Sequence, residues 1–121
     1  MTTILFIDDD SNCGLIAKLY LEKNDFKVYV AKDTTKARNL LNRNKFDLII
    51  SDIGMPGESG IDFYKWLQDE DQYKNIPVFL VSAHASNLAD LDPKVNVEFF
   101  VKPLFFPKLI DRILSILNEQ N

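Results

Sequence analysis

Short apolar segments recur along this chain and alternate with segments whose apolar residues follow helical spacing. The five apolar segments are TILFI (3–7), KVYVA (27–31), DLIIS (47–51), VFLVSA (78–83) and VEFFV (97–101). Several of them are apolar at consecutive positions, which is typical of strands buried on both faces, as in a parallel sheet covered by helices. The pattern therefore predicts an α/β protein.

The segments between the apolar runs predict helices. After the first run, the expected buried stripe is Cys13, Ile16, Ala17, Tyr20 and Leu21. The expected N-caps are Ser11, Thr34 or Thr35, and Ser59. A weak fourth helix is expected over 85–91, because Pro93 ends it. A last helix is expected over 107–117, since Pro107 is acceptable in a first turn. We therefore expect one domain over residues 1–121.

Five repeats of strand and helix favour a doubly wound (βα)5 sheet with helices on both faces. Reactive groups in such a sheet belong at the carboxyl ends of its strands, beside the point where strand order reverses. The polar residues there are Asp8, Asp9 and Asp10 after the first strand, Asp52 after the third, Ser82 on the fourth and Lys102 after the fifth. Parallel strands would bring these side chains to one edge, although Asp10 is expected only to favour the N-terminus of the following helix.

Acids outnumber basic residues at this edge. Two unit charges about 5 Å apart, as Asp9 and Asp52 would be, repel by roughly 3 kcal/mol at an effective dielectric of about 20. With Asp8 included, three carboxylates face Lys102, and their excess charge favours a divalent cation with oxygen ligands, which is typical of Mg²⁺. This setting suits phosphoryl transfer, so Asp52 is a candidate nucleophile that becomes an aspartyl phosphate.

Composition argues against several other classes of protein. The 14 basic and 18 acidic residues give a net charge of −4 without a basic patch, so we expect no direct binding of nucleic acid. Cys13 is the sole cysteine, which excludes an internal disulfide and suits a reducing compartment. The sequence has neither a basic signal-peptide start nor an apolar run of about 18 residues, so we expect a cytoplasmic protein without membrane contact.

The segments FIDDDS, SDIGMPGESG, LVSAHA and FFVKPL together resemble the receiver domain of bacterial two-component response regulators. The resemblance covers essentially the whole chain, in the right order and with similar spacing. It implies a flavodoxin-like fold with strand order 2-1-3-4-5. It also implies that a histidine kinase or phosphotransfer protein phosphorylates Asp52. The domain would help catalyse this transfer and the later hydrolysis, which makes it an enzyme only in part.

The resemblance further assigns roles to the residues of the site. Asp52 would be the phosphoacceptor. Mg²⁺ would be held by Asp9, Asp52 and the backbone carbonyl of Gly54, with Asp8 acting through a water molecule. Lys102 would pair with the phosphoryl group.

A switch and an output surface are implied as well. Ser82 would bond a phosphoryl oxygen, and Phe99 would turn from solvent into the space behind Ser82. The fourth helix, fifth strand and fifth helix would form a face that binds a downstream protein or a second copy of the chain. Phe99 and Phe105 are candidates for exposure there, with Phe106 close by. The alternatives are that Phe99 is a partly buried strand residue and that Phe106 belongs to the core. The peptide bond before Pro103 is often cis in this family.

Three other interpretations compete with the receiver domain. A flavodoxin-like cofactor carrier needs Gly, Ser and Thr in its first loop, where this chain has DDDSN. A haloacid-dehalogenase-type phosphatase usually has a second acid at the position of Gly54. A pseudo-receiver that only binds proteins should lack Asp52, Asp9 or Lys102, and all three are present. The chain could also be one domain of a longer regulator or hybrid kinase. His84 is expected to have at most a modulatory role.

Overall fold

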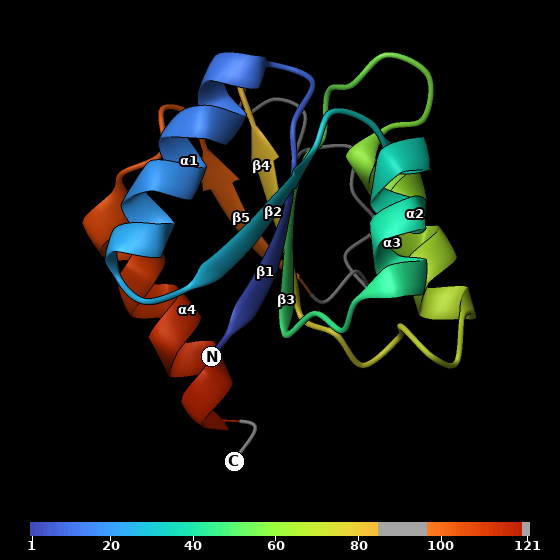
Figure 1. Cartoon of the computed structure of the whole chain (residues 1–121). Coiled ribbons are helices and arrows are strands. Elements are labelled where there is room, and N and C mark those ends of the chain that lie inside the picture. Colours follow the sequence, from blue (N-terminus) through green and yellow to red (C-terminus); the bar gives the residue numbers. More distant parts are fainter. Residues whose placement is uncertain (85–96, 120–121) are drawn as a thin grey trace.

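A single parallel sheet organises the chain, whose computed structural model describes residues 1–84 and 97–119 (Figure 1). The strands are β1 (Thr3–Ile7), β2 (Lys27–Ala31), β3 (Leu48–Asp52), β4 (Val78–Ser82) and β5 (Glu98–Val101). They pair in parallel in the order β2-β1-β3-β4-β5. This confirms the predicted flavodoxin-like α/β fold and its strand order.

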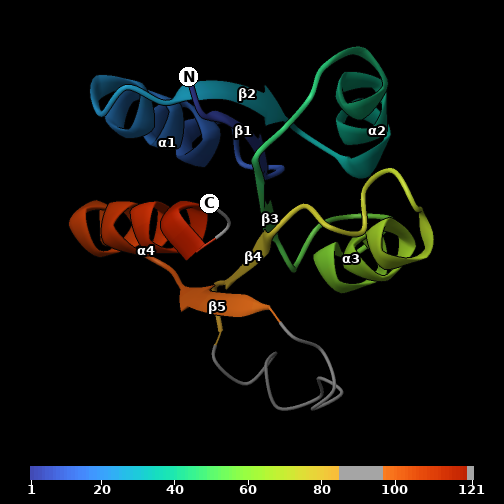
Figure 2. The ribbon, with the colours of Figure 1, turned by 90° about the horizontal axis from the view of Figure 1, so that it is seen from below.

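Helices cover both faces of the sheet. Those in the described residues are α1 (Ser11–Lys23), α2 (Thr34–Arg43), α3 (Gly60–Asp69) and α4 (Phe106–Glu119). Figure 2 shows α1 and α4 on one face and α2 and α3 on the other, as a doubly wound sheet requires. The helix predicted over 85–91 lies outside the described residues, so the predicted last helix is α4. Within the described part of the chain, no helix has the length and apolar character needed to cross a membrane.

Aspartates cap the first two helices. Asp10 is the N-cap of α1 and Asp33 that of α2, and each side chain accepts backbone N–H hydrogen bonds from the first turn. The caps predicted at Ser11 and at Thr34 or Thr35 are therefore wrong by one or two residues. A carboxylate at these positions also interacts favourably with the positive end of the helix dipole, which a hydroxyl does less well.

The two faces of the sheet bury separate apolar clusters. Leu5 and Ile49 pack in the cluster under α2 and α3, whereas Ile4 and Ile50 pack in the cluster under α1 and α4. All four side chains are fully buried. Because the central strands are covered on both faces, they need apolar residues at successive positions, which explains the continuous runs in the sequence.

The buried stripe of α1 differs from the predicted one. Gly14 and Ala17 are buried, whereas Ile16 and Tyr20 are 46% and 51% exposed. A Cβ atom on Gly14 would lie 2.7 Å from Cγ1 of Val30. The missing side chain therefore lets α1 approach β2 closely along its small residues, which leaves the larger apolar side chains nearer the surface.

Candidate functional site

Two buried aspartates end neighbouring central strands. Asp8 directly follows β1, and its backbone N–H donates to the carbonyl oxygen of Ala31 at 3.0 Å. Asp52 is the last residue of β3 and lies opposite Val81 in the register with β4. Only 2% of Asp8 and 7% of Asp52 is exposed. The parallel sheet therefore delivers both carboxylates to one edge, largely shielded from water.

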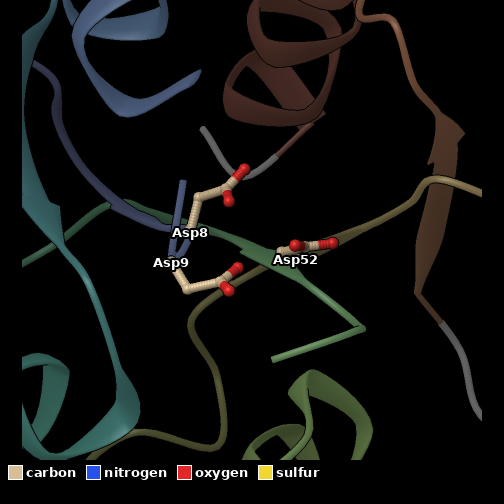
Figure 3. Close-up of side chains that lie close together, drawn as sticks. All are labelled: Asp8, Asp9 and Asp52. Atoms are coloured by element: carbon tan, nitrogen blue, oxygen red, sulfur yellow. The ribbon is translucent and has the colours of Figure 1, made fainter. Parts of the chain in front are cut away.

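A third carboxylate joins them from the surface. Asp9 is exposed, and ligand oxygens of Asp8, Asp9 and Asp52 all lie within 4.8 Å of one another. Figure 3 shows the three side chains close together at the ends of β1 and β3. Asp10, the next acid along the chain, instead caps α1. The structure thus brings together the three carboxylates that the sequence predicts as metal ligands.

Lys102 reaches this cluster because β5 pairs with β4. Its backbone N–H, one residue beyond β5, donates to the carbonyl oxygen of Ser82 at 2.8 Å. Its Nζ donates to Oδ2 of Asp8 at 2.8 Å and to Oδ2 of Asp52 at 3.3 Å. The peptide bond from Lys102 to Pro103 is cis. One ammonium group therefore bridges two buried carboxylates, and the cluster keeps an excess of negative charge.

The pKa shifts follow from this crowding. Burial, followed by the charge of Asp8, raises the pKa of Asp52 above its ordinary value, and Lys102 only partly opposes them. Burial acts to lower the pKa of Lys102, but the hydrogen bond and charge of Asp8, together with the charge of Asp52, outweigh it and raise that pKa. The lysine therefore stays charged, while the carboxylate of Asp52 is held at an electrostatic cost that a further cation would relieve.

The available ligands fit a hard divalent cation. The cluster of Asp8, Asp9 and Asp52 offers carboxylate oxygens, which are the donors that Mg²⁺ prefers. Cys13 is half-buried nearby, and burial and the charge of Asp8 raise the pKa of its thiol. A protonated thiol is a poor metal ligand. The site can therefore hold a cation through oxygen alone.

The loop from β3 to α3 passes tightly behind Asp52. A Cβ atom on Gly60 would lie 2.1 Å from the carbonyl oxygen of Asp52, so a larger residue would displace the loop. Gly57 has a φ of +81°, which glycine adopts without strain. Met55 is 8% exposed and packs in the core. Gly54 is exposed, and its carbonyl stays a predicted ligand.

Ser82 is buried at the end of β4. Its Oγ donates to the carbonyl oxygen of His84 at 2.7 Å and accepts a hydrogen bond from the backbone N–H of His84 at 3.1 Å. A serine hydroxyl bonded to backbone two residues on is typical of a tight turn. His84 thus contacts Ser82 through its backbone, which sequence reasoning missed. The role of Ser82 toward a phosphoryl group stays a prediction.

The expected group of exposed aromatic residues does not form. Phe99 is half-buried and packs against the cluster under α2 and α3. Phe106 packs against the opposite cluster, where its ring stacks on Tyr20 at 4.6 Å. Only Phe105, at 69% exposed, stands out from the surface. Phe99 lies on β5 and packs on one face of the sheet, whereas Phe106 begins α4 and packs on the other, so nearness in sequence does not give one patch.

One feature of the site has no signal in the sequence. Arg38 on α2 and Glu58 in the loop after Asp52 form a bidentate ion pair, with distances of 2.7 and 3.0 Å. Nothing in the spacing of these residues predicts their contact, because it depends on how α2 packs beside the loop. The pair ties the loop behind Asp52 to a neighbouring helix.

Comparisons with known proteins agree with this arrangement. The family model of the response regulator receiver domain matches residues 4–114. The transcriptional regulatory protein CpxR of Escherichia coli K12 is 33% identical over 126 residues, which cover 100% of this chain and 51% of CpxR. The polar-differentiation response regulator DivK of Brucella anthropi is 30% identical, and the match covers 93% of this chain and 92% of DivK.

Solved structures are similar over the same range. The response regulator TrrA of Thermotoga maritima, in complex with Mg²⁺ and BeF, is 26% identical with a TM-score of 0.84, covering 95% of this chain and 98% of TrrA. The chain spans about half the length of CpxR. Since the family model spans nearly the whole chain and the acids and the lysine meet at the carboxyl edge, this chain belongs to the response regulator receiver domain family.

Proposed function

We propose that this chain is a phosphorylation-controlled signalling module in which Asp52 accepts the phosphoryl group. Receiver domains are in general phosphorylated by histidine kinases and relay the signal to downstream targets. The observation that carries the proposal is the contact of Lys102 Nζ with Oδ2 of Asp52 at 3.3 Å, beside two more carboxylates. This combines a nucleophile, a cation and an oxygen ligand set at the end of one buried strand.

In the proposed transfer, a carboxylate oxygen of Asp52 forms a bond to phosphorus as the bond to the donor's leaving group breaks. The leaving group keeps that electron pair, and the product is an aspartyl phosphate. The donor would be a phosphohistidine of a histidine kinase or phosphotransfer protein. Burial of Asp52 supports this role, because it limits competing solvation of the nucleophile.

Lys102 supplies the positive charge that belongs to the chain itself. Asp8 accepts the shorter of its two hydrogen bonds, 2.8 Å against 3.3 Å to Asp52. Asp8 would therefore hold the ammonium in place while Lys102 exchanges its contact with Asp52 for one with a phosphoryl oxygen. Fixed charge of this kind stabilises a transition state without reorganisation during the reaction.

The carboxylate cluster supports a role for Mg²⁺ at this site. Asp9, Asp52 and the carbonyl of Gly54 would hold the cation, with Asp8 acting through a water molecule. When bound, Mg²⁺ would supply positive charge next to the phosphoryl oxygens. In hydrolysis, a water oxygen would form the new bond to phosphorus as the bond to the Asp52 oxygen breaks, and the Asp52 carboxylate would keep that electron pair. The domain would thus catalyse its own phosphorylation and dephosphorylation without turnover of a small metabolite.

The signal would leave through the fourth loop and β5. Ser82 would exchange its bond with the His84 backbone for one with a phosphoryl oxygen, and Phe99 would then settle further inward behind it. This rearrangement would change the binding of a downstream protein or a second copy of the chain. Two such states need to differ by only a few kcal/mol for a modification to change their populations.

An alternative is a pseudo-receiver that binds proteins without phosphorylation. The presence of Asp52, Asp9 and Lys102 in one cluster argues against it. Whether the chain acts alone or as a domain of a longer regulator is left open by the relatives, because DivK matches over 92% of its length and CpxR over 51%.

Labelling by acetyl phosphate tests this proposal. We expect Mg²⁺-dependent phosphorylation of the parent chain, confined to Asp52, and labelling at background level in Asp52→Asn. Glu22→Gln, a substitution on α1 outside the cluster, serves as the matched control and should label like the parent. Equal labelling of Asp52→Asn and the parent would refute the assignment of Asp52.

A further inference from the structure

The loop that follows Asp52 is closed at its base. The backbone N–H groups of Met55 and Gly60 both donate to the carbonyl oxygen of Ile53, at 3.2 and 3.0 Å. The loop thus leaves and returns to the residue after Asp52, and Gly54 lies inside it. These bonds hold the base of the loop, but the position of its outer part depends on other contacts.

Glu58 anchors the outer part of this loop to α2. Its two carboxylate oxygens accept from Nη1 and Nη2 of Arg38 at 2.7 and 3.0 Å. The side chain of Thr34, at the start of α2, also acts to lower the pKa of the Glu58 carboxyl. A bidentate pair fixes both distance and orientation, unlike a single contact between point charges.

Arg38 is itself held by α3. Its guanidinium carbon lies 4.3 Å from the ring centroid of Trp66 and 5.1 Å from that of Phe63. The Arg38 and Glu58 side chains are only 31% and 28% exposed. Stacking and partial burial restrict the arginine before it meets Glu58, so this pair should be stronger than an exposed ion pair. We call Arg38 and Glu58 the loop clamp.

The ionisation of Glu58 agrees with this geometry. The hydrogen bond from Arg38 outweighs the effect of burial and lowers the pKa of the Glu58 carboxyl. The carboxylate is therefore charged at neutral pH, and the clamp is formed under ordinary conditions.

The sheet and the loop clamp position different ligands of the site. Asp8, Asp9 and Asp52 are placed by the sheet, through β1 and β3. Gly54 is instead in the loop, between the two residues joined by the bond from the Met55 N–H to the Ile53 carbonyl oxygen. Among the predicted ligands, the Gly54 carbonyl is therefore the one whose position depends on the loop: on this bond at its base and on the contacts that hold its outer part.

We propose that Arg38 and Glu58 are positioning residues, which hold the loop after Asp52 so that the Gly54 carbonyl is preorganised for the divalent cation. This inference rests on the proposed function. It predicts that loss of the clamp weakens cation binding in part, since the carboxylates remain. It also predicts that loss of the clamp makes the loop backbone more mobile than in the parent when no cation is bound.

The test uses Arg38→Ala, Arg38→Lys, Glu58→Gln and the double variant Arg38→Ala/Glu58→Gln. Lys74→Ala is the matched control, because it removes an exposed ion pair with Asp71, 3.2 Å long, away from the site. Titration with Mg²⁺ alone, followed by the amide signals of residues 53–60 in NMR, gives the dissociation constant. Amide hydrogen exchange without Mg²⁺ measures the freedom of the loop.

We expect Arg38→Ala and Glu58→Gln each to raise the Mg²⁺ dissociation constant by about three- to tenfold. Loop amides should exchange faster by a similar factor, while amides of β1 and β3 keep the parent rates. Arg38→Lys keeps the charge but loses the bidentate geometry, so it should fall between Arg38→Ala and the parent. The double variant should bind Mg²⁺ no more weakly than whichever single variant binds it less tightly, because the two residues act as one unit.

The positioning role of the clamp would be overturned if Arg38→Ala and Glu58→Gln kept Mg²⁺ dissociation constants within about twofold of that of Lys74→Ala, with unchanged exchange of the loop amides. It would also be overturned if the losses of Mg²⁺ binding free energy in the two single variants added up in the double variant. Faster exchange throughout the chain would mean that the pair only supports the fold, and this also overturns the proposal. If the clamp alone fails, the parent still binds Mg²⁺ and labels on Asp52; if the proposed function fails, the parent does neither.

Discussion

The aspartates at the two edges of the same sheet differ in their exposure and in their partners. At the amino edge, Asp47 is exposed and accepts a hydrogen bond from the backbone N–H of Thr3 at 2.8 Å. At the carboxyl edge, Asp8 and Asp52 are buried and share the ammonium group of Lys102. A solvated carboxylate that caps a strand helps the fold at little cost. Buried carboxylates in excess of their cations cost stability, and this cost agrees with the function proposed for the carboxyl edge.

The central comparison therefore concerns charge compensation. Solvent and a backbone N–H group suffice at the amino edge, whereas the buried carboxylates of the carboxyl edge share Lys102 and would gain from a further cation. Interactions among partly buried charges are worth several times those in water, because the effective dielectric is lower. Substitutions at the two edges should consequently change the free energy of unfolding by different amounts and with different signs, and Mg²⁺ should alter these changes only at the carboxyl edge.

The largest effect is expected from Lys102→Met, which keeps the aliphatic length but removes the charge. Asp8 and Asp52 would lose their shared cation, so the free energy of unfolding in metal-free buffer should fall by about 2 kcal/mol. Urea unfolding measures it. Mg²⁺ should restore part of the loss, while the NMR response to beryllofluoride is blunted. An unchanged stability, or a full response to beryllofluoride, would contradict the role of Lys102.

Asp9→Ala should mainly affect cation binding. Asp9 is the exposed member of the cluster, so its loss should scarcely change the fold. We expect the Mg²⁺ dissociation constant to rise at least about tenfold, equivalent to about 1.4 kcal/mol. Calorimetric titration measures the change, and an unchanged constant would remove Asp9 from the metal site.

Asp52→Asn should stabilise the metal-free protein. Burial and the charge of Asp8 raise the pKa of Asp52, so its ionised form disfavours the folded state at neutral pH. Removal of that charge should raise the free energy of unfolding by about 1 kcal/mol, measured by urea unfolding in the presence of a chelator. A loss of stability instead would mean that the bond with Lys102 outweighs the repulsion from Asp8.

The smallest effect is expected at the amino edge. Asp47→Asn keeps an oxygen that can accept from the N–H of Thr3, and the side chain is exposed. The free energy of unfolding of this variant should differ from that of the parent by no more than about 0.5 kcal/mol. Mg²⁺ should stabilise the variant and the parent equally. A change as large as that of Lys102→Met would show that the two edges do not differ as described.

The carboxyl edge was predictable from sequence because its geometry follows from a few strong rules. Continuous apolar runs fixed the strands, parallel pairing fixed which ends meet, and Asp8, Asp52 and Lys102 stand at those ends. The acids and the lysine therefore had to gather whatever the details of helix packing. Strand order came from the family resemblance, since no local pattern encodes it.

Features that depend on packing between elements were not predictable. Gly14 shifts the buried stripe of α1 because β2 lies close beneath it. Glycine has no apolar side chain, so a hydrophobic pattern does not mark it as a buried position. Phe99 is partly buried, as one of the two alternatives for it predicts, but the sequence does not show that Phe99 and Phe106 pack on opposite faces of the sheet and leave Phe105 apart. The contact of Arg38 with Glu58 joins residues from separate elements, and its formation is set by the tertiary fold.

The proposed divalent cation site at the carboxyl edge is tested most directly by thermal unfolding with and without Mg²⁺. The parent chain and Asp9→Ala are compared in saturating Mg²⁺ and in sodium chloride of matched ionic strength. We predict that Mg²⁺ raises the midpoint of the parent by about 5 °C, through binding to the folded state, and that of Asp9→Ala far less. An unchanged midpoint of the parent, or an equal rise in Asp9→Ala, would contradict a cation site at this edge.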